Sequence, residues 1–169
     1  MCHPHDQGTL LSMQDVTIIY ASTSGHTEYV ISRLVVFFAS ALPAMQVRRV
    51  LAEKATPEDI EGAKVLVLGS GTWNTGGVEG QLNPHMDELL RRRAAEVKLE
   101  GKPCTMIALG DDRYYYTARA GEHMRSYIVN HGGKIFCDPL TIINDPFGQE
   151  ERVEKWGKKF LAALQQSST

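Results

Sequence analysis

The sequence predicts an α/β protein: a three-layer, doubly wound domain in which a five-stranded parallel sheet carries helices on both faces. Three observations predict it. The 169 residues are enough for one domain with a substantial core. Five short segments that read as strands alternate with segments of helical periodicity, and no linker or internal repeat divides them. Alternation of this kind favours parallel strands joined by right-handed helical crossovers.

Five short strands are predicted, of which the first is an apolar, β-branched run typical of a strand buried on both faces and the third is also expected to be buried. They comprise residues 16–20, 46–51, 64–68, 104–109 and 134–143. The last strand is expected to be interrupted at Pro139, because proline has no N–H to donate to a neighbouring strand.

The predicted helices between the strands place apolar side chains three or four residues apart. Their apolar faces are Val30, Leu34, Phe37 and Phe38; Leu82, Met86, Leu89 and Leu90; Ala120, Met124, Tyr127, Ile128 and His131; and Val153, Trp156, Phe160, Leu161 and Leu164. A further short helix is expected to begin after the capping hydroxyl of Thr56 and to end at Gly62. Arg91, Arg92 and Arg93 are expected to complement a helix C-terminus and to face water.

The ends of the chain fall outside this pattern. We expect residues 1–13 to be a flexible leader, residues 14–166 a single domain and residues 167–169 a tail. The leader contains four possible metal-ligating residues, Cys2, His3, His5 and Asp6. A flexible segment without a second cluster of ligands does not favour a metal site, and none is predicted.

Composition restricts the class of protein. The formal net charge of -2 gives no electrostatic reason to expect a nucleic-acid partner or attraction to a membrane. No apolar run approaches the ~18 residues of a membrane span. The three cysteines are an odd number without paired spacing, and Cys104 and Cys137 fall in apolar segments. Free thiols and a cytoplasmic location are therefore expected.

The turn after the first predicted strand, residues 22–27, reads Ser-Thr-Ser-Gly-His-Thr. Free backbone N–H groups and the helix dipole make a strand-to-helix junction an anion site, and Gly25 lets the backbone approach a ligand closely. The turn has no lysine or arginine and matches neither Gly-x-x-x-x-Gly-Lys nor Gly-x-Gly-x-x-Gly. A single terminal phosphate held by neutral donors fits best. The alternative is an elaborate helix cap that binds nothing.

Two further loops follow predicted strands and carry aromatic side chains. Residues 69–77 place Trp73 in a glycine-rich stretch, and residues 110–116 end in three consecutive tyrosines. A planar ligand would bury Trp73 and one of the tyrosines. The alternatives are an indole folded onto the core and a solvent-exposed aromatic cluster. Because the carboxyl ends of parallel strands meet near the topological switch point, function is expected at these loops and the turn.

Three segments resemble the flavodoxin family. Residues 18–27, Ile-Ile-Tyr-Ala-Ser-Thr-Ser-Gly-His-Thr, are similar to the family's signature. Residues 72–74 (Thr-Trp-Asn) and residues 110–114 (Gly-Asp-x-x-Tyr) resemble its two flavin-stacking loops. The resemblance extends from about Asp15 to Leu164. It implies a flavodoxin-like fold with sheet order 2-1-3-4-5 and non-covalently bound FMN. The uninterrupted passage from residue 134 to residue 149 resembles the short-chain type.

By this resemblance the turn binds the FMN phosphate without a counter-charge, Trp73 and Tyr114 cover the two faces of the isoalloxazine, and Asp111 contacts its polar edge. The residues that it assigns to FMN are Ser22, Thr23, Ser24, Gly25, His26, Thr27, Gly71, Thr72, Trp73, Asn74, Thr75, Gly76, Gly110, Asp111, Tyr114, Tyr116 and Thr117. His26 either contacts the phosphate or is an exposed first residue of the helix. No catalytic residue is predicted.

The resemblance implies an electron carrier rather than an enzyme. FMN would carry electrons between a reductase and acceptor enzymes, and the chain would be a monomer. One alternative is an NAD(P)H-dependent FMN quinone or flavin reductase of the same superfamily, but no clear nicotinamide segment is present. Another is a sensing module that has lost its flavin, against which the intact set of three loops argues.

Two residues are expected to tune the flavin. In the family, the peptide after the tryptophan flips on one-electron reduction to the semiquinone. The residue here is Asn74, which tolerates a positive φ less well than glycine. The chain is also less acidic than flavodoxins typically are, and Arg113 lies in a flavin loop. We expect this cation to stabilise the anionic, fully reduced flavin, and we leave the charge of the partner open.

Overall fold

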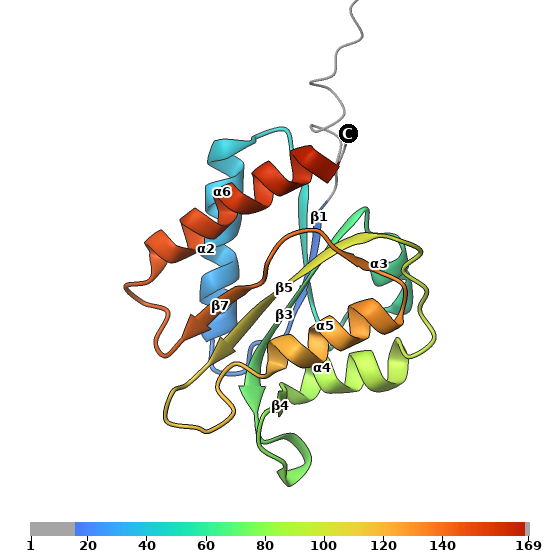
Figure 1. The fold of residues 1–169 in the computed structure, drawn as a ribbon, viewed down its shortest axis with the longest axis vertical. Helices are drawn as coiled ribbons and strands as arrows, with labels where there is room; N and C mark the ends of the chain where they lie inside the picture. Colours follow the sequence, from blue (N-terminus) through green and yellow to red (C-terminus); the bar gives the residue numbers. More distant parts are fainter. Residues whose placement is uncertain (1–15, 168–169) are drawn as a thin grey trace, which may run out of the picture.

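The computed structural model describes residues 16–167, which form a twisted sheet between two layers of helices (Figure 1). The predicted leader, with Cys2, His3, His5 and Asp6, and the last two residues lie outside the described residues. The domain limits 14–166 therefore remain a prediction.

The sheet confirms the predicted parallel architecture. Its strands are β1 (Val16–Tyr20), β2 (Val47–Leu51), β3 (Val65–Trp73), β4 (Gln81–Leu82), β5 (Pro103–Gly110), β6 (Lys134–Ile135) and β7 (Leu140–Ile143). The order is β2-β1-β3-β5-β6, and β7 also pairs with β5. Since β6 and β7 are the two halves of the predicted fifth strand, the order equals the expected 2-1-3-4-5. The break falls around Pro139, as predicted.

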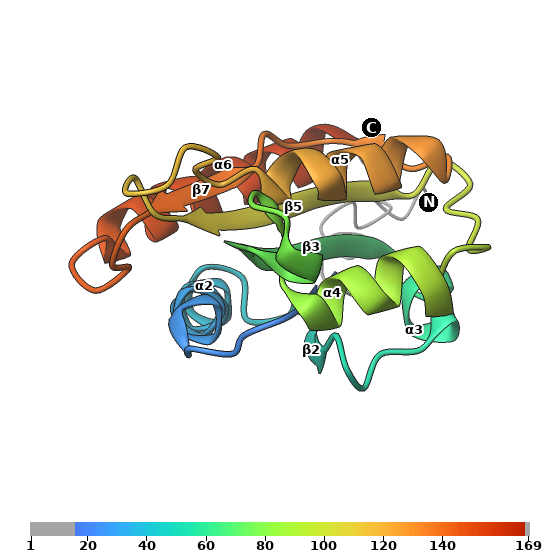
Figure 2. The same cartoon turned by 90° about the horizontal axis from the view of Figure 1, so that it is seen from below.

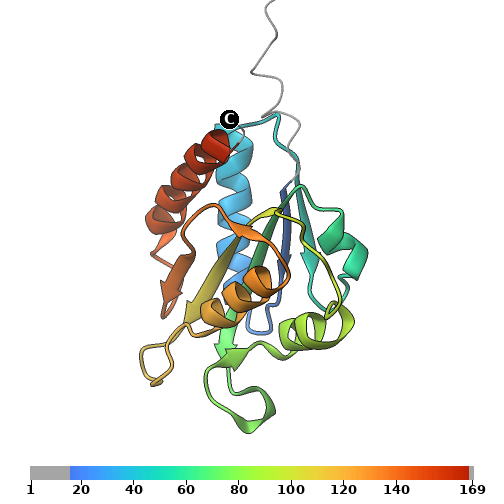
Figure 3. The ribbon, with the colours of Figure 1, turned by 45° about the vertical axis from the view of Figure 1, so that its right-hand side comes forward.

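The helices cover the two faces of the sheet. They are α2 (His26–Ala41), α3 (Pro57–Glu61), α4 (Pro84–Glu88), α5 (Ala120–Asn130) and α6 (Glu150–Ser167). Helices α2 and α6 pack on one face, while α3, α4 and α5 lie on the other, as Figures 1 and 3 show. Successive residues of β1 face opposite cores: Ile18 belongs to the α2/α6 core, and Ile19 belongs to the other. Both are fully buried, as expected for a central strand.

Two predicted boundaries were wrong. Strand β3 does not end at Leu68 but runs to Trp73, because β5 and the short antiparallel strand β4 pair with its second half. Leu82, assigned from its spacing to a helical face, lies instead in β4 opposite Thr72. The apolar side chain is buried in either case, so the spacing alone could not separate the two structures.

The short helix α3 begins as predicted. The Thr56 hydroxyl accepts the backbone N–H of Asp59, and the Asp59 carboxylate accepts the backbone N–H of Thr56. This reciprocal capping box satisfies two N–H groups that the helix leaves free, and Gly62 ends the helix.

Arg93 corrects the expectation for the arginine run. A π-helical turn, η2 (Leu89–Arg93), extends α4, and Arg93 does not simply face water. Its guanidinium donates to the backbone carbonyls of Ala52 and Ala55 and contacts Glu88. Arg93 therefore fastens the loop after β2 to the end of η2.

Both described cysteines are buried free thiols. Burial raises the pKa of Cys104 to about 12 and that of Cys137 to about 11. No helix within residues 16–167 is long and apolar enough to span a membrane.

Candidate functional site

A cavity of about 700 Å³ opens at the carboxyl ends of β1, β3 and β5. Figure 2, seen from below, shows β3 and β5 together with α2. The turn after β1 and the loops after β3 and β5 all line the cavity, as predicted. Its volume is within the range usual for sites that bind small molecules and cofactors.

The turn after β1 presents a row of free donors. In the part of the chain that the structure describes, no group accepts a hydrogen bond from the backbone N–H groups of residues 23–27. Gly25 precedes α2 with φ = 90°, a conformation that glycine adopts readily. Ser22 is engaged elsewhere, because its Oγ accepts the N–H of Glu28 at 3.0 Å. The row is thus available to an anion at the positive end of the α2 dipole.

Trp73 is the last residue of β3, directly before the loop that follows the strand. Strand pairing with Gln81 fixes the backbone of Trp73, and the indole lies over Gly71, where an added Cβ would be 3.1 Å from Nε1. The Trp73 side chain is half-buried rather than packed into the core. Asn74 follows with φ = -95° and ψ = 54°, and its carbonyl accepts the N–H of Gly77 at 3.3 Å.

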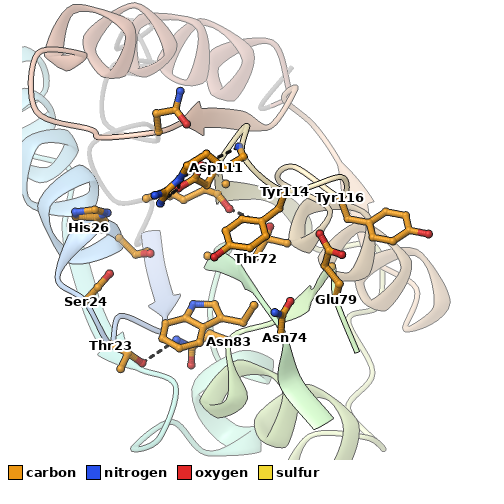
Figure 4. Close-up of a pocket in the computed structure, with 18 of the residues that line it drawn as sticks. Thr23, Ser24, His26, Thr72, Asn74, Glu79, Asn83, Asp111, Tyr114 and Tyr116 are labelled. Carbon is orange, nitrogen blue, oxygen red and sulfur yellow. Dashed lines mark hydrogen bonds and ion pairs between the residues drawn. The ribbon is translucent and has the colours of Figure 1, made fainter. Parts of the chain in front are cut away.

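The three tyrosines after β5 have different surroundings. Tyr114 extends toward the cavity between the turn and Asn74, whereas Tyr116 points away (Figure 4). The Tyr116 ring stacks under Arg119, whose Cζ lies 4.5 Å from the ring centroid, and it contacts Tyr115 edge-on. Tyr115 is 86% exposed. Tyr114 is therefore the tyrosine best placed to cover a planar ligand.

Hydrogen bonds tie the two aromatic loops together. The Thr72 hydroxyl donates to the carbonyl of Leu109 and accepts the N–H of Ala120. The Glu79 carboxylate accepts the N–H of Tyr115 at 3.1 Å. These contacts hold the walls of the cavity at a fixed separation.

Asp111 and Arg113 form a two-pronged ion pair at the rim. Arg113 Nε lies 2.9 and 3.0 Å from the two carboxylate oxygens, and the backbone N–H of Arg113 also donates to Asp111. These hydrogen bonds lower the pKa of Asp111 to about 2 and raise the pKa of Arg113. Arg113 is thus paired with Asp111 and is not an isolated cation.

The charge around the cavity is more acidic than the chain as a whole. Among residues 16–167, four carboxylates line it, those of Glu79, Asp111, Asp112 and Asp145, against one guanidinium, that of Arg113. The net charge of -2 does not reveal this cluster of carboxylates, because it sums the charges of the whole chain.

Most of the residues predicted from the sequence line the cavity. They are Thr23, Ser24, His26, Thr27, Gly71, Thr72, Trp73, Asn74, Gly110, Asp111, Tyr114 and Tyr116. Five others support its loops without lining it: Ser22, Gly25, Thr75, Gly76 and Thr117. The Thr117 hydroxyl, for example, donates to the carbonyl of Tyr114.

Sequence reasoning missed several lining residues. Asn83 follows β4 and lies beside the turn, while Asn144 and Asp145 follow β7. Asn144 and Asp112 bond reciprocally, each side chain engaging the other residue at 3.0 Å. Asn83 stands directly before Pro84, and an Asn-Pro pair at a helix start could have drawn attention to it.

The donor set of the cavity suits a flavin mononucleotide. The free N–H row matches an anionic phosphate without needing a cation. Half-buried Trp73 and exposed Tyr114 offer apolar faces to a planar ring. Together the fold and the cavity define a nucleotide-binding, doubly wound α/β protein with its site at the carboxyl ends of the strands.

Comparison with known proteins identifies the family. The flavodoxin family model matches residues 18–156. A flavodoxin of Nitratidesulfovibrio vulgaris is 27% identical over 154 residues, which are 90% of this chain and 100% of that protein. The probable flavodoxin 2 of Bacillus subtilis is 23% identical over 88% of this chain and 95% of its own length. The crystal structure of oxidised flavodoxin 2 from Bacillus cereus superposes with a TM-score of 0.76 at 25% identity, covering 90% of this chain and 99% of that one.

This chain belongs to the flavodoxin family. It is a short-chain flavodoxin that binds FMN and carries electrons to and from redox partners, rather than an enzyme. The predictions of fold, cofactor and electron-carrier function are confirmed, and the alternative of an NAD(P)H-dependent reductase is not favoured.

Proposed function

We propose that the cavity described above is the FMN site, with the phosphate on residues 22–27 and the ring between Trp73 and Tyr114. The observation that carries this proposal is the row of unpartnered N–H groups in residues 23–27, at one end of the cavity. FMN supplies reversible electron uptake when it is bound. The chain's own residues bind it, orient it and exclude water from its faces.

The other predicted site residues shape this cavity. Gly71 and Gly110 leave room for the Trp73 indole and the Ala118 backbone, while Thr72, Thr75 and Thr117 hold the loops through hydroxyl bonds to backbone carbonyls. The polar edge of the ring would meet the loop of Gly110 and Asp111. Tyr116 also lines the cavity, and its ring packs against Arg119.

Flavin titrations of the apoprotein test the site. We expect FMN fluorescence to be quenched at one equivalent, and riboflavin, which lacks the phosphate, to bind much more weakly. Trp73→Ala and Tyr114→Ala should each weaken FMN and riboflavin alike, because each removes a face that both ligands share. Equal affinity of the wild type for the two flavins would contradict the assignment of the turn.

The rim of the cavity is the proposed docking surface for redox partners. A reductase and an acceptor enzyme would dock in turn at the rim of the cavity, where carboxylates and exposed tyrosines suit a basic surface with apolar groups. The protein would act as a monomer in the cytoplasm. Sedimentation should give the mass of one chain, and NAD(P)H with a quinone should give no rapid turnover until a reductase is added.

A further inference from the structure

Asn83 is a buried amide at the phosphate end of the cavity, and it is held from two sides. Its side chain is 1% exposed. Its backbone N–H donates to Ser70 Oγ at 3.0 Å, and Ser70 is itself fully buried. Its Oδ1 accepts the backbone N–H of His85 at 3.0 Å, which caps α4. The amide therefore has little freedom to rotate.

These contacts fix which end of the amide faces the phosphate turn. A backbone N–H can only donate, so the amide oxygen must be the atom facing His85. The amide nitrogen then faces Thr23, and Nδ2 donates to Thr23 Oγ1 at 3.0 Å (Figure 4). The orientation of the Asn83 amide is therefore assigned from the hydrogen-bonding groups around it.

The bond from Asn83 determines what the Thr23 hydroxyl can do. A threonine hydroxyl has one hydrogen to donate and two lone pairs that accept. Because one lone pair receives the Asn83 N–H, the hydrogen remains for another acceptor. Thr23 lines the cavity, and no acceptor for its hydroxyl hydrogen is found in residues 16–167. A phosphate bound at the turn would offer only acceptor oxygens when fully ionised.

We propose that Asn83 is a positioning residue that makes the Thr23 hydroxyl a donor to the FMN phosphate. The inference rests on the proposed function, and it adds a residue from outside the turn. It matters because the turn contains no lysine or arginine, so each neutral donor contributes to phosphate affinity. An amide is required at position 83, since a carboxylate would itself accept the Thr23 hydroxyl hydrogen and leave none for the phosphate.

Asn83→Asp tests this requirement with almost no change in shape. One aspartate oxygen still accepts the His85 N–H, and the other can only accept from Thr23. We expect FMN affinity to fall by about 10- to 100-fold, as for loss of a hydrogen bond to a charged group. Riboflavin affinity should stay within about twofold, because riboflavin has no phosphate. Asn130→Asp, which adds the same charge at the exposed end of α5, is the matched control.

A double-mutant cycle separates the hydroxyl from the added charge. Thr23→Val removes the hydroxyl while keeping the shape. If Asn83 acts through Thr23, Asn83→Asp should cost FMN affinity several-fold less in the Thr23→Val background than in the wild type. Equal losses in the two backgrounds would mean simple repulsion and would overturn the inference.

A neutral variant guards against misfolding. Asn83→Ser keeps a capping oxygen for His85 but places no N–H donor on Thr23, and it should lower FMN affinity several-fold with riboflavin affinity unchanged. Inorganic phosphate gives a readout without flavin: it should raise the melting temperature of the wild-type apoprotein more than that of Asn83→Asp. If the wild type itself fails to prefer FMN over riboflavin, the proposed site is wrong. If the wild type prefers FMN and Asn83→Asp keeps that preference, only the role of Asn83 is wrong.

Discussion

Asn74 begins the loop after Trp73, with a negative φ and a carbonyl that accepts the N–H of Gly77. Turning over the peptide that carries the Asn74 carbonyl would break its hydrogen bond of 3.3 Å with the Gly77 N–H. The change would favour a residue at position 74 that tolerates a positive φ. We expect Asn74→Gly to raise the potential for uptake of the first electron by about 30 mV, equivalent to several tenths of a kcal/mol. Redox titration measures it, and an unchanged or lower potential would contradict the role of Asn74.

Arg113 is the arginine that lines the cavity among the described residues, and Asp111 neutralises it in part. Arg113→Gln removes the positive charge and leaves the Asp111 carboxylate without its partner. Both changes disfavour a negative charge on the reduced flavin, so the potential for the second electron should fall, on the order of 20–50 mV. Potentiometry at fixed ionic strength measures this shift, and Arg113→Lys should restore most of it.

The same pair predicts a change in titration. Arg113 lowers the folded-state pKa of Asp111 to about 2, so its stabilising effect is complete above the unfolded-state pKa and is lost as pH falls through about 2. In Arg113→Gln the Asp111 pKa should return toward the usual range for a carboxyl. A pH titration followed by carboxyl NMR would show it, and a pKa that stayed near 2 would point to another cause.

At the level of elements, Gly110 joins β5 to the tyrosine loop with no room for a side chain. A Cβ there would lie 2.2 Å from the backbone nitrogen of Ala118. We expect Gly110→Ala to destabilise the fold by about 2 kcal/mol or more, because the obstacle is backbone that cannot rotate away. Urea denaturation measures this loss. Gly101→Ala is the control: its Cβ meets open space, and only its positive φ costs about 1 kcal/mol.

Arg93 connects two elements that are distant in sequence, the loop after β2 and the turn η2. Arg93→Ala removes donors from the carbonyls of Ala52 and Ala55, and a loss of about 1–2 kcal/mol of unfolding free energy is expected. Arg92→Ala, at an exposed neighbour in the same turn, should change stability by less than about 0.5 kcal/mol. Equal effects of the two substitutions in thermal unfolding would show that the Arg93 bonds contribute nothing.

For the whole molecule, the distribution of charge matters more than its sum. Carboxylates surround the cavity, whereas the exposed face of α6 carries Lys155, Lys158 and Lys159 away from it. The chain should therefore donate electrons to a basic cytochrome c with a rate that falls as salt is added, despite a net charge of only -2. Stopped-flow measurements at several ionic strengths would show this.

Two substitutions that each remove one negative charge test that distribution of charge. Asp145→Asn removes a carboxylate at the cavity, and Glu96→Gln removes an exposed one that does not line it. The first should slow electron transfer and flatten its salt dependence, and the second should do neither. Equal effects would mean that only the net charge steers the partner.

The sequence indicated much of the site because its strongest signals are local. The hydroxyl-rich turn at residues 22–27 depends on a strand-to-helix junction that short-range patterns reveal. Trp73 and the three tyrosines of residues 114–116 stood out for the same reason, as large rings in glycine-rich or polar loops, and the resemblance to the flavodoxin family singled out Tyr114 among them. Leu82 was misassigned because both a buried strand and the buried face of a helix call for an apolar residue, so its spacing did not distinguish β4 from a helix.

The sequence by itself determined the alternation of strands and helices, the hydroxyl-rich turn and the two aromatic loops, since each follows from periodicity or from a short motif within one segment, whereas the sheet order came from the resemblance to the flavodoxin family. The tertiary structure alone decided the partners of single polar groups. Asn83 meets Thr23 across 60 positions of the chain, Arg93 meets Ala52 across 41, and Asp112 meets Asn144 across 32. Hydrogen bonds form between atoms about 3 Å apart in space, and no local pattern records which distant residue the fold brings to that distance.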